Sequence, residues 1–164
     1  MKKHLIAGVV GGVLIAALAS AQMGMGRGMG GGMGGPGMMG HGPEGVSMVR
    51  HRFVMMNGIA PQYAKSHNPL AANDGNLATG RALFETNCAT CHGATGRGDG
   101  PAAKGLVPPP ANIAAVIRMP IASDAFLDWT ISEGGIPVQS AMPPFKTVLS
   151  KEDIWKLELY LRTL

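Results

Sequence analysis

The sequence predicts an all-α fold of three to four helices, and three features lead to that prediction. Apolar residues recur at three- and four-residue steps within the stretches 77–91, 123–134 and 150–164. Each stretch begins near a residue that favours helix N-termini, and the first two are followed by glycine. No run alternates between apolar and polar residues with a period of two, so we expect no β-sheet.

Residues 1–21 have the pattern of a secretory signal peptide. A basic start precedes an apolar run from Leu5 to Ala19, and small residues allow cleavage after Ala21. This run of about 15 residues is short for a bilayer-spanning helix, which needs about 20. We therefore expect export to the periplasm, with an uncleaved membrane anchor as the alternative.

Residues 22–45 are predicted to be disordered because they are half glycine and cannot pack a core. The simplest interpretation is a flexible tether. A second hypothesis is Cu(I) capture, because thioethers are soft ligands that suit this ion. The side chains that would supply such a site are Met23, Met25, Met29, Met33, Met38, Met39 and His41.

Residues 46–75 are predicted to be a linker with a short helix that ends at Gly58. Pro61 and Pro69 favour extended backbone in its second half. We expect His51 and His67 to be solvated or locally hydrogen-bonded rather than metal ligands. The segment contains more apolar and aromatic residues than a bare tether needs.

The predicted domain, residues 76–164, begins with a helix from Leu77 to about Cys91. An Asn-Asp pair ahead of it can cap its start, and Gly93 can end it. One face of this helix carries residues at three- and four-residue steps: Leu77, Gly80, Phe84, Cys88 and Cys91.

Two further helices are predicted nearer the C-terminus. One covers 123–134, with Ser123 as its N-cap. The other begins at Ser150, which can form a capping box with Asp153. The apolar stripe of this last helix is Ile154, Leu157, Leu161 and Leu164. Glycines in 93–100 resemble a phosphate-binding loop only weakly, because no strand precedes them.

Charge excludes one class of partner. The chain has a formal net charge of +4, but from residue 76 onward eight Lys and Arg residues balance eight Asp and Glu residues. With no basic stripe and few aromatic residues, nucleic-acid binding is not predicted. No Ser/His/Asp arrangement and no carboxylate pair marks a catalytic pocket, so we do not expect an enzyme.

The chemistry of the chain is concentrated in Cys-Ala-Thr-Cys-His, residues 88–92, which contain its only two cysteines. On a helix, Cys88 and Cys91 lie one turn apart, so their thiols reach two points along the edge of one flat ligand. His92 can point toward the centre of that ligand. A porphyrin fits this arrangement: each thiol adds across a vinyl double bond to form a thioether, and His92 ligates the iron. The motif therefore predicts one covalently attached haem c.

Other interpretations of the two cysteines fit less well. A disulfide, the usual fate of cysteine pairs in exported proteins, gives His92 no purpose. A thioredoxin-like redox pair requires a βαβ setting, which this sequence lacks. A structural zinc site needs about four ligands, typically with a second Cys or His pair, and this sequence has no such second pair.

Met142 is the expected second axial ligand of the iron. It lies in a loop before the last helix, and the two prolines that follow it stiffen that loop. A thioether favours ferrous iron and raises the reduction potential relative to two histidine ligands. Met119 is the second candidate, and the remaining alternatives are an open sixth position or a histidine from the tail. For the second ring nitrogen of His92 we expect a carbonyl acceptor from Pro101, Pro109 or Pro110.

With these motifs in place, residues 76–164 resemble a class I c-type cytochrome. The matching pieces are GRALFETNCATCHG, GATGRGDGPAA, LVPPPANI and MPPFKTVLSKEDIWKLELYLRTL, in this order. The resemblance implies a cytochrome c-like fold whose first and last helices cross near the haem. Gly80 and Phe84 would then meet Leu157, Tyr160 or Leu161. The glycine- and methionine-rich tail matches no part of the family pattern.

The resemblance implies a periplasmic monohaem cytochrome that carries single electrons between redox proteins of a respiratory chain. The main alternative is a fixed cytochrome c subunit of a membrane oxidase, reductase or dehydrogenase complex, associated with the membrane through that complex. A third hypothesis, a peroxidase or ligand sensor, would require that Met142 not bind the iron.

Overall fold

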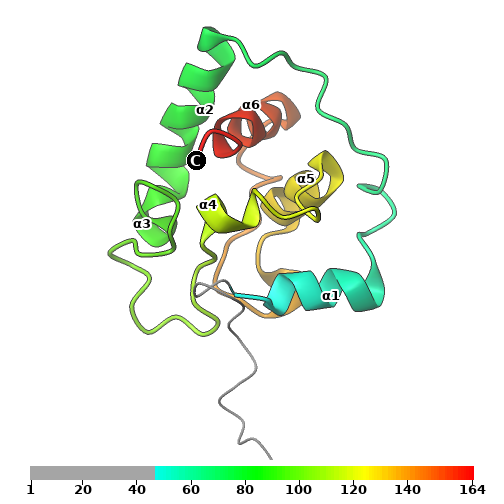
Figure 1. The fold of residues 1–164 in the computed structure, drawn as a ribbon, viewed down its shortest axis with the longest axis vertical. Coiled ribbons are helices and arrows are strands. Elements are labelled where there is room, and N and C mark those ends of the chain that lie inside the picture. Colours follow the sequence, from blue (N-terminus) through cyan, green and yellow to red (C-terminus); the bar gives the residue numbers. More distant parts are fainter. Residues whose placement is uncertain (1–46) are drawn as a thin grey trace, which may run out of the picture. The chain divides into compact units, whose positions relative to one another are not determined.

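The computed structural model describes residues 47–164, which fold into helices joined by loops (Figure 1). The predicted signal peptide and the glycine- and methionine-rich segment lie outside the described residues. Within 47–164 the only β-type feature is an isolated bridge residue at Ser47, in agreement with the all-α prediction. In the same range, no helix is both long enough and apolar enough to cross a bilayer.

Helix α2 (Asp74–Asn87) is the first helix predicted for the domain, but it differs from the prediction at both ends. It begins at Asp74, where the side chain of Asn73 accepts a hydrogen bond from the Asn76 amide at 2.9 Å. It ends at Asn87, and a single turn, α3 (Ala89–His92), follows the break at Cys88. The haem-attachment motif therefore sits on its own helical turn, which ends at Gly93 as predicted.

Helices α5 (Asp124–Glu133) and α6 (Lys151–Leu161) confirm the other two predicted helices. The Ser123 hydroxyl accepts the Phe126 amide at 3.2 Å, and Gly134 ends α5. Ser150 and Asp153 form the predicted capping box at the start of α6. These local signals locate both helices because they involve residues only three positions apart.

Helix α1 (Val49–Asn57) brings the number of helices with nine or more residues to four in the described chain. The shorter elements are α3, α4 (Ile113–Val116) and the 3₁₀ turn η2 (Ile136–Val138). Asn112 caps α4 by accepting the Ala115 amide at 3.1 Å. Elements this short carry too little periodicity to be predicted.

Helices α2 and α6 cross in close contact, as the resemblance implied. Gly80 is buried at the crossing, where a Cβ would lie 2.1 Å from the backbone oxygen of Lys156. The rings of Phe84 and Tyr160 pack with centroids 5.5 Å apart. The surrounding core cluster consists of Phe84, Ile131, Phe145, Ile154, Leu157 and Leu161.

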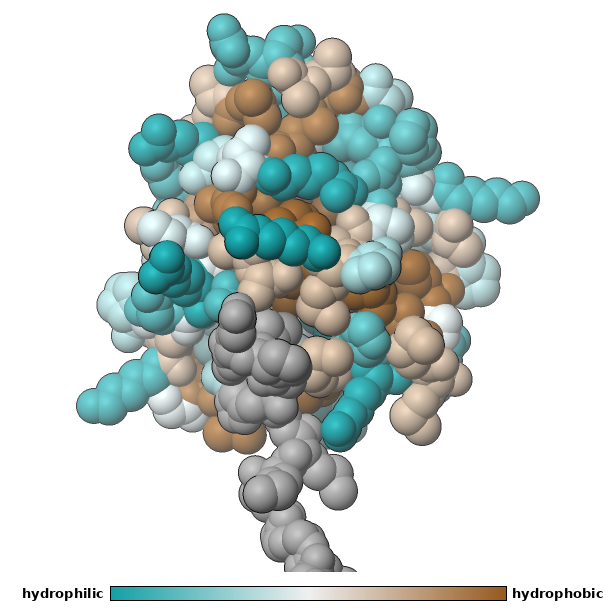
Figure 2. All heavy atoms as spheres, viewed as in Figure 1, coloured by the Kyte–Doolittle hydropathy of each residue, from teal (hydrophilic) through white to brown (hydrophobic). Residues whose placement is uncertain are grey.

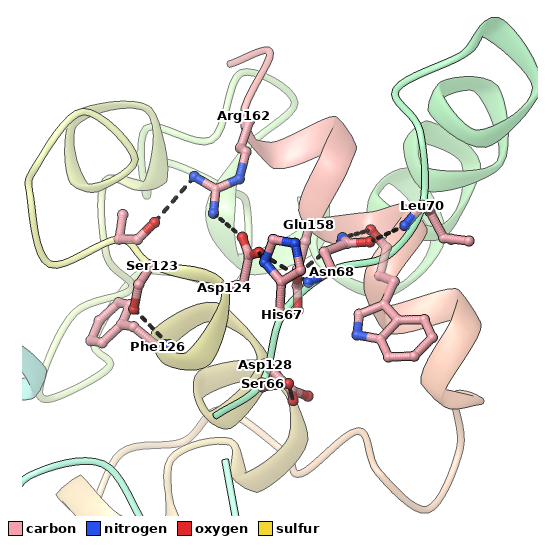
Figure 3. Close-up of polar contacts among 12 residues, drawn as sticks. Ser66, His67, Asn68, Leu70, Ser123, Asp124, Phe126, Asp128, Glu158 and Arg162 are labelled. Carbon is pink, nitrogen blue, oxygen red and sulfur yellow. Dashed lines mark hydrogen bonds and ion pairs between the residues drawn. The ribbon is translucent and has the colours of Figure 1, made fainter. Parts of the chain in front are cut away.

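A second core cluster joins α1 to α5. The ring of Phe53 stacks on Trp129 with centroids 5.7 Å apart. The α1–α2 segment (residues 58–73) then runs toward the start of α2 (Figure 1). It is fastened by polar contacts (Figure 3): Asn68 donates to the Trp155 carbonyl at 2.8 Å, and Ser66 donates to the Asp128 carboxylate. This part of the expected linker therefore packs on the domain.

Candidate haem site

The loop after α3 folds back onto the turn that carries the two cysteines. The amides of Gly98 and Gly100 donate to the carbonyls of His92 and Cys91 at 2.7 and 3.2 Å. A Cβ on Gly100 would lie 2.4 Å from the Thr90 oxygen, and Gly98 has φ +82°. The glycines of this loop therefore serve close backbone packing, which accounts for them without a phosphate.

His92 is oriented by a backbone carbonyl in the proline-rich loop. Its Nδ1 lies 2.9 Å from the carbonyl oxygen of Ala111. Because a carbonyl only accepts hydrogen bonds, Nδ1 carries the proton and Nε2 keeps a free lone pair. The loop was predicted correctly, but the acceptor is Ala111 and not Pro101, Pro109 or Pro110. The Pro110 oxygen instead faces Gly98, where a Cβ would lie 2.5 Å away.

Burial sets the protonation states of the motif. It lowers the pKa of His92, with a further lowering from the charge of Arg50, while the Ala111 hydrogen bond acts in the opposite direction. Burial also raises the pKa of the Cys88 thiol to about 11, aided by Cys91. His92 is therefore favoured in the neutral form that ligates metals, and Cys88 stays a neutral thiol rather than a reactive thiolate.

Met142 is held by the end of α5. Its carbonyl accepts the Gly135 amide at 2.7 Å. A Cβ on Gly134 would lie 2.3 Å from the Pro143 oxygen, so this glycine permits close approach of the loop. Phe145 donates its amide to the Ile131 carbonyl at 3.1 Å and buries its ring in the first core cluster. The loop is thus tied to α5 and the glycines that follow it, at Met142 and again at Phe145.

One cavity of about 400 Å³ brings the four predicted site residues together: Cys88, Cys91, His92 and Met142. Met119, the second methionine candidate, lines the same cavity, and so does His51. His67 does not; it lies 3.0 Å from Asp124 with 86% of its side chain exposed. The walls are largely apolar and include Leu106, Ile113, Val116, Phe126, Ile131, Phe145, Leu157 and Leu161. On the face drawn in Figure 2, hydrophobic residues are also visible at the surface between hydrophilic ones.

The polar atoms of the cavity fit a haem. Of five buried side-chain polar atoms without a hydrogen-bond partner in the described chain, three belong to residues that line the cavity. They are Nη1 of Arg50, Nδ1 of His51 and Oγ1 of Thr130. Haem would supply an apolar ring for the walls, iron for the imidazole and thioether, vinyl groups for the thiols, and carboxylates for the orphaned nitrogens. A metal ion bound directly by side chains is less well supported, because residues 47–164 hold no group of three or more His, Cys, Asp or Glu side chains that could bind one.

The residues that sequence reasoning missed are those brought in from outside the motif. Arg50 and His51 lie on α1, the short helix that was predicted within the linker segment. The expectation that His51 is solvated or locally hydrogen-bonded was wrong, because its Nδ1 is buried without a partner in the described chain. No local pattern in that segment points toward the cavity, because the contact with the domain is made over more than 80 residues. Ala111, in contrast, directly follows the three prolines that indicated this loop.

Comparison with known proteins connects the site to a family. The family model described as "Cytochrome C oxidase, cbb3-type, subunit III" matches residues 75–161. No curated protein matches the chain significantly. One similar solved structure is the reducing HAO-like protein complex of Kuenenia stuttgartiensis, with 23% identity and a TM-score of 0.48. That match covers 58% of this chain and 46% of the other, so the chain spans less than half of that neighbour. Another is cytochrome CL from the marine methylotrophic bacterium Methylophaga aminisulfidivorans MPT, with 23% identity, a TM-score of 0.42, and coverage of 74% and 70%.

Proposed function

Because this chain belongs to the family described as cytochrome C oxidase, cbb3-type, subunit III, and is thus a class I c-type cytochrome, we propose that it is an exported carrier of single electrons with one haem c. Haem, when bound, supplies an iron that alternates between Fe(II) and Fe(III). The observation that carries the proposal is that Cys88, Cys91, the oriented His92 and Met142 all line one largely apolar cavity of the described chain.

Each residue of the site has a role in this proposal. Cys88 and Cys91 hold the porphyrin through thioether bonds. His92 presents Nε2 to the iron because Nδ1 is bound to Ala111. Met142 would ligate the iron through its thioether, and the apolar walls would keep water away, which together favour the ferrous state. With His92 and Met142 both bound, the iron would have no place for a substrate, which supports electron transfer rather than catalysis.

Covalent attachment is tested by extracting denatured protein with acidified acetone. We expect the pigment to stay with the polypeptide of the full-length chain produced with a c-type maturation system. The Cys88→Ala/Cys91→Ala variant should lose the pigment and remain unfolded, because the cavity is then left without its filling. Free extraction of pigment from the unsubstituted protein would refute the proposal.

The axial ligand is tested by the near-infrared spectrum of the oxidised protein. Ligation by Met142 predicts a weak sulfur-to-iron charge-transfer band that disappears in Met142→Ala. Met119→Ala is the matched control, since Met119 lines the same cavity, and should keep the band. The opposite result would assign Met119, and absence of the band from unsubstituted protein would favour an open or histidine-ligated iron.

Periplasmic location and a diffusible redox partner are part of the proposal. Fractionation should release the mature chain with periplasmic contents, cleaved after Ala21. Co-purification with a membrane respiratory complex after mild detergent extraction would instead support the fixed-subunit alternative. Sedimentation of the purified protein as a monomer would favour the carrier.

A further inference from the structure

The start of α1 contributes a buried cation to the wall of the cavity. Arg50 donates from Nη2 to the Gly134 carbonyl at 2.6 Å, and its Cζ lies 4.9 Å from the centre of the Trp129 ring. Its other terminal nitrogen, Nη1, is buried and has no hydrogen-bond partner in residues 47–164. Two contacts thus fix the guanidinium beside the cavity while one donor group remains unsatisfied.

The buried guanidinium of Arg50 would be stabilised by an anion bound beside it. Burial lowers the pKa of Arg50 to about 10, which still leaves the side chain charged at neutral pH. Within the described chain Arg50 takes part in no ion pair. A buried donor or charge without a partner is costly, so an acceptor from a bound molecule would stabilise this arrangement.

The neighbouring residue repeats the same feature. Nδ1 of His51 is also buried without a partner in the described range, and His51 lines the same cavity. Two successive residues that line the cavity therefore each carry a buried nitrogen without a partner in the described chain. Helices α1 and α3 lie well apart in Figure 1, although residues of both line the cavity. The two thiols come from α3 and its N-cap, whereas Arg50 comes from α1, so the thiols and the guanidinium reach the cavity from different helices.

We propose that Arg50 and His51 bind the propionate carboxylates of the haem, so that α1 completes a haem site lying otherwise within the family region. The inference rests on the proposed function, because it takes haem as the ligand. It adds that residues before the matched range 75–161 are part of the site. Nη1 of Arg50 can donate a charge-assisted hydrogen bond to one carboxylate, and Nδ1 of His51 can donate a second contact.

The test compares reduction potentials of the full, haem-loaded protein and three variants. In Arg50→Gln the carboxylates lose a positive neighbour, which favours Fe(III). We expect about a tenfold fall in the ratio of reduced to oxidised protein at a fixed applied potential, equivalent to about 59 mV for a one-electron couple. Arg50→Lys should stay closer to the unsubstituted protein because it keeps the charge. Arg52→Gln is the matched control, since Arg52 is an exposed cation on the same helix, and should leave the potential unchanged.

A second measurement reports the contact itself and does not depend on the folding of Arg50→Gln. Haem labelled with ¹³C at its propionate carboxyl carbons identifies their infrared bands, which separates them from any free anion bound by Arg50. We expect label-sensitive bands of hydrogen-bonded carboxylates that shift in Arg50→Lys. Bands typical of solvated carboxylates, or a wild-type potential in folded, haem-loaded Arg50→Gln, would overturn the inference while leaving the proposed function intact. Failure of the unsubstituted protein to retain covalent haem would overturn both.

Discussion

Helix α6 is held on two sides by opposite means. Toward α2 it packs through backbone, with Gly80 against Lys156, and through aromatic rings. Toward α5 and the α1–α2 segment it is held by buried polar groups around Glu158 (Figure 3). The first contact depends on the absence of a side chain, whereas the second depends on particular donors and acceptors. Helix α6 is thus specified by shape on one face and by charge on another.

The polar side is the more sensitive to conditions. Glu158 is 0% exposed, and in the described chain only one of its two carboxylate oxygens has a hydrogen-bond partner. Asp128, 1% exposed, pairs with Lys151 and accepts from Ser66. The contact between α2 and α6 is made by backbone and aromatic rings, so its strength should change little with pH. Burial of a carboxylate favours its protonated form, so the polar side should respond to pH.

The largest expected effect comes from breaking the shape-based side. In Gly80→Ala the new Cβ would lie 2.1 Å from the Lys156 oxygen and 2.9 Å from the Tyr160 Cβ. Since the first of these is backbone, α2 and α6 must separate, and we expect a loss of about 3–5 kcal/mol of unfolding free energy. Denaturant titration of the haem-loaded protein measures it.

Gly75→Ala is the matched control on the same helix. Its Cβ would meet only the side chain of Asn73, at 3.5 Å. Alanine also has the higher helix propensity, so stability should be unchanged or rise by up to about 1 kcal/mol. Equal losses in both variants would show that the crossing is not the shape-determined contact described above.

The next effect concerns Glu158 and the pH dependence of stability. Burial, and then the charge of Asp128, raise the pKa of Glu158 from the ordinary value of 4.5 to about 8. Between these values the folded protein keeps a proton that the unfolded chain releases, so stability is fully present below 4.5 and falls as pH rises toward about 8. Glu158→Gln removes this slope and should stabilise the protein by about 2–3 kcal/mol at pH 7.

The measurement is a series of denaturant titrations from pH 4 to pH 9. Glu152→Gln serves as the control, because Glu152 is an exposed residue of the same helix. Its curve should follow that of the unsubstituted protein. If Glu158→Gln and the unsubstituted protein keep the same slope between pH 5 and pH 8, the polar side does not respond to pH in this way.

A smaller effect is expected from removing the partner of Glu158. Asn68→Ala loses donated hydrogen bonds to the Trp155 carbonyl at 2.8 Å and to Glu158 at 3.1 Å. With part-buried acceptors left unsatisfied, the loss should be about 2 kcal/mol. Because the Asn68 hydrogen bond lowers the pKa of Glu158, its removal raises that pKa further and extends the pH slope upward.

Asn57→Ala provides the comparison for Asn68→Ala. Asn57 donates to the Phe53 carbonyl at 2.9 Å, but the contact is exposed and within one turn. Water can replace it, so little change is expected. An equal loss in both variants would mean that burial does not distinguish the α1–α2 segment from ordinary surface structure.

The two sides also differ in how far sequence predicts them. Gly80, Phe84 and Leu157 lie on regular apolar stripes, so their helices could be anticipated, and the resemblance to class I c-type cytochromes implied that these helices meet. Cys88, Cys91 and His92 could be proposed as site residues from the sequence alone, because their chemistry depends on spacing within five residues. The break at Cys88 was not predicted, because the apolar steps continue across it.

The polar side and the α1 wall could not be predicted in this way. Asn68 meets Trp155 across 87 residues, and Arg50 meets Gly134 across 84. Pairings of this kind leave no periodic pattern in the sequence. Glu158 is a charged residue that would be expected on the solvent-exposed face of α6, but it is fully buried. Met142 is intermediate: its loop was recognisable, but the hydrogen bond that fixes it, from Gly135, was not.

The smallest effect concerns the signal that was easiest to predict. Ser150→Ala removes the hydroxyl that accepts the Asp153 amide at 3.1 Å, and with it the capping box of α6. A lost N-cap costs about 1 kcal/mol, and Ser150→Asp should restore most of it because aspartate also caps helices. Denaturant titrations of both variants measure the difference. The N-cap determines the residue at which α6 begins, whereas packing against neighbouring elements supplies most of the stability of the helix. If Ser150→Ala were as destabilising as Gly80→Ala, the N-cap of α6 would contribute as much unfolding free energy as its packing against α2. That result would contradict the conclusion that packing contributes more to the stability of α6 than its N-cap.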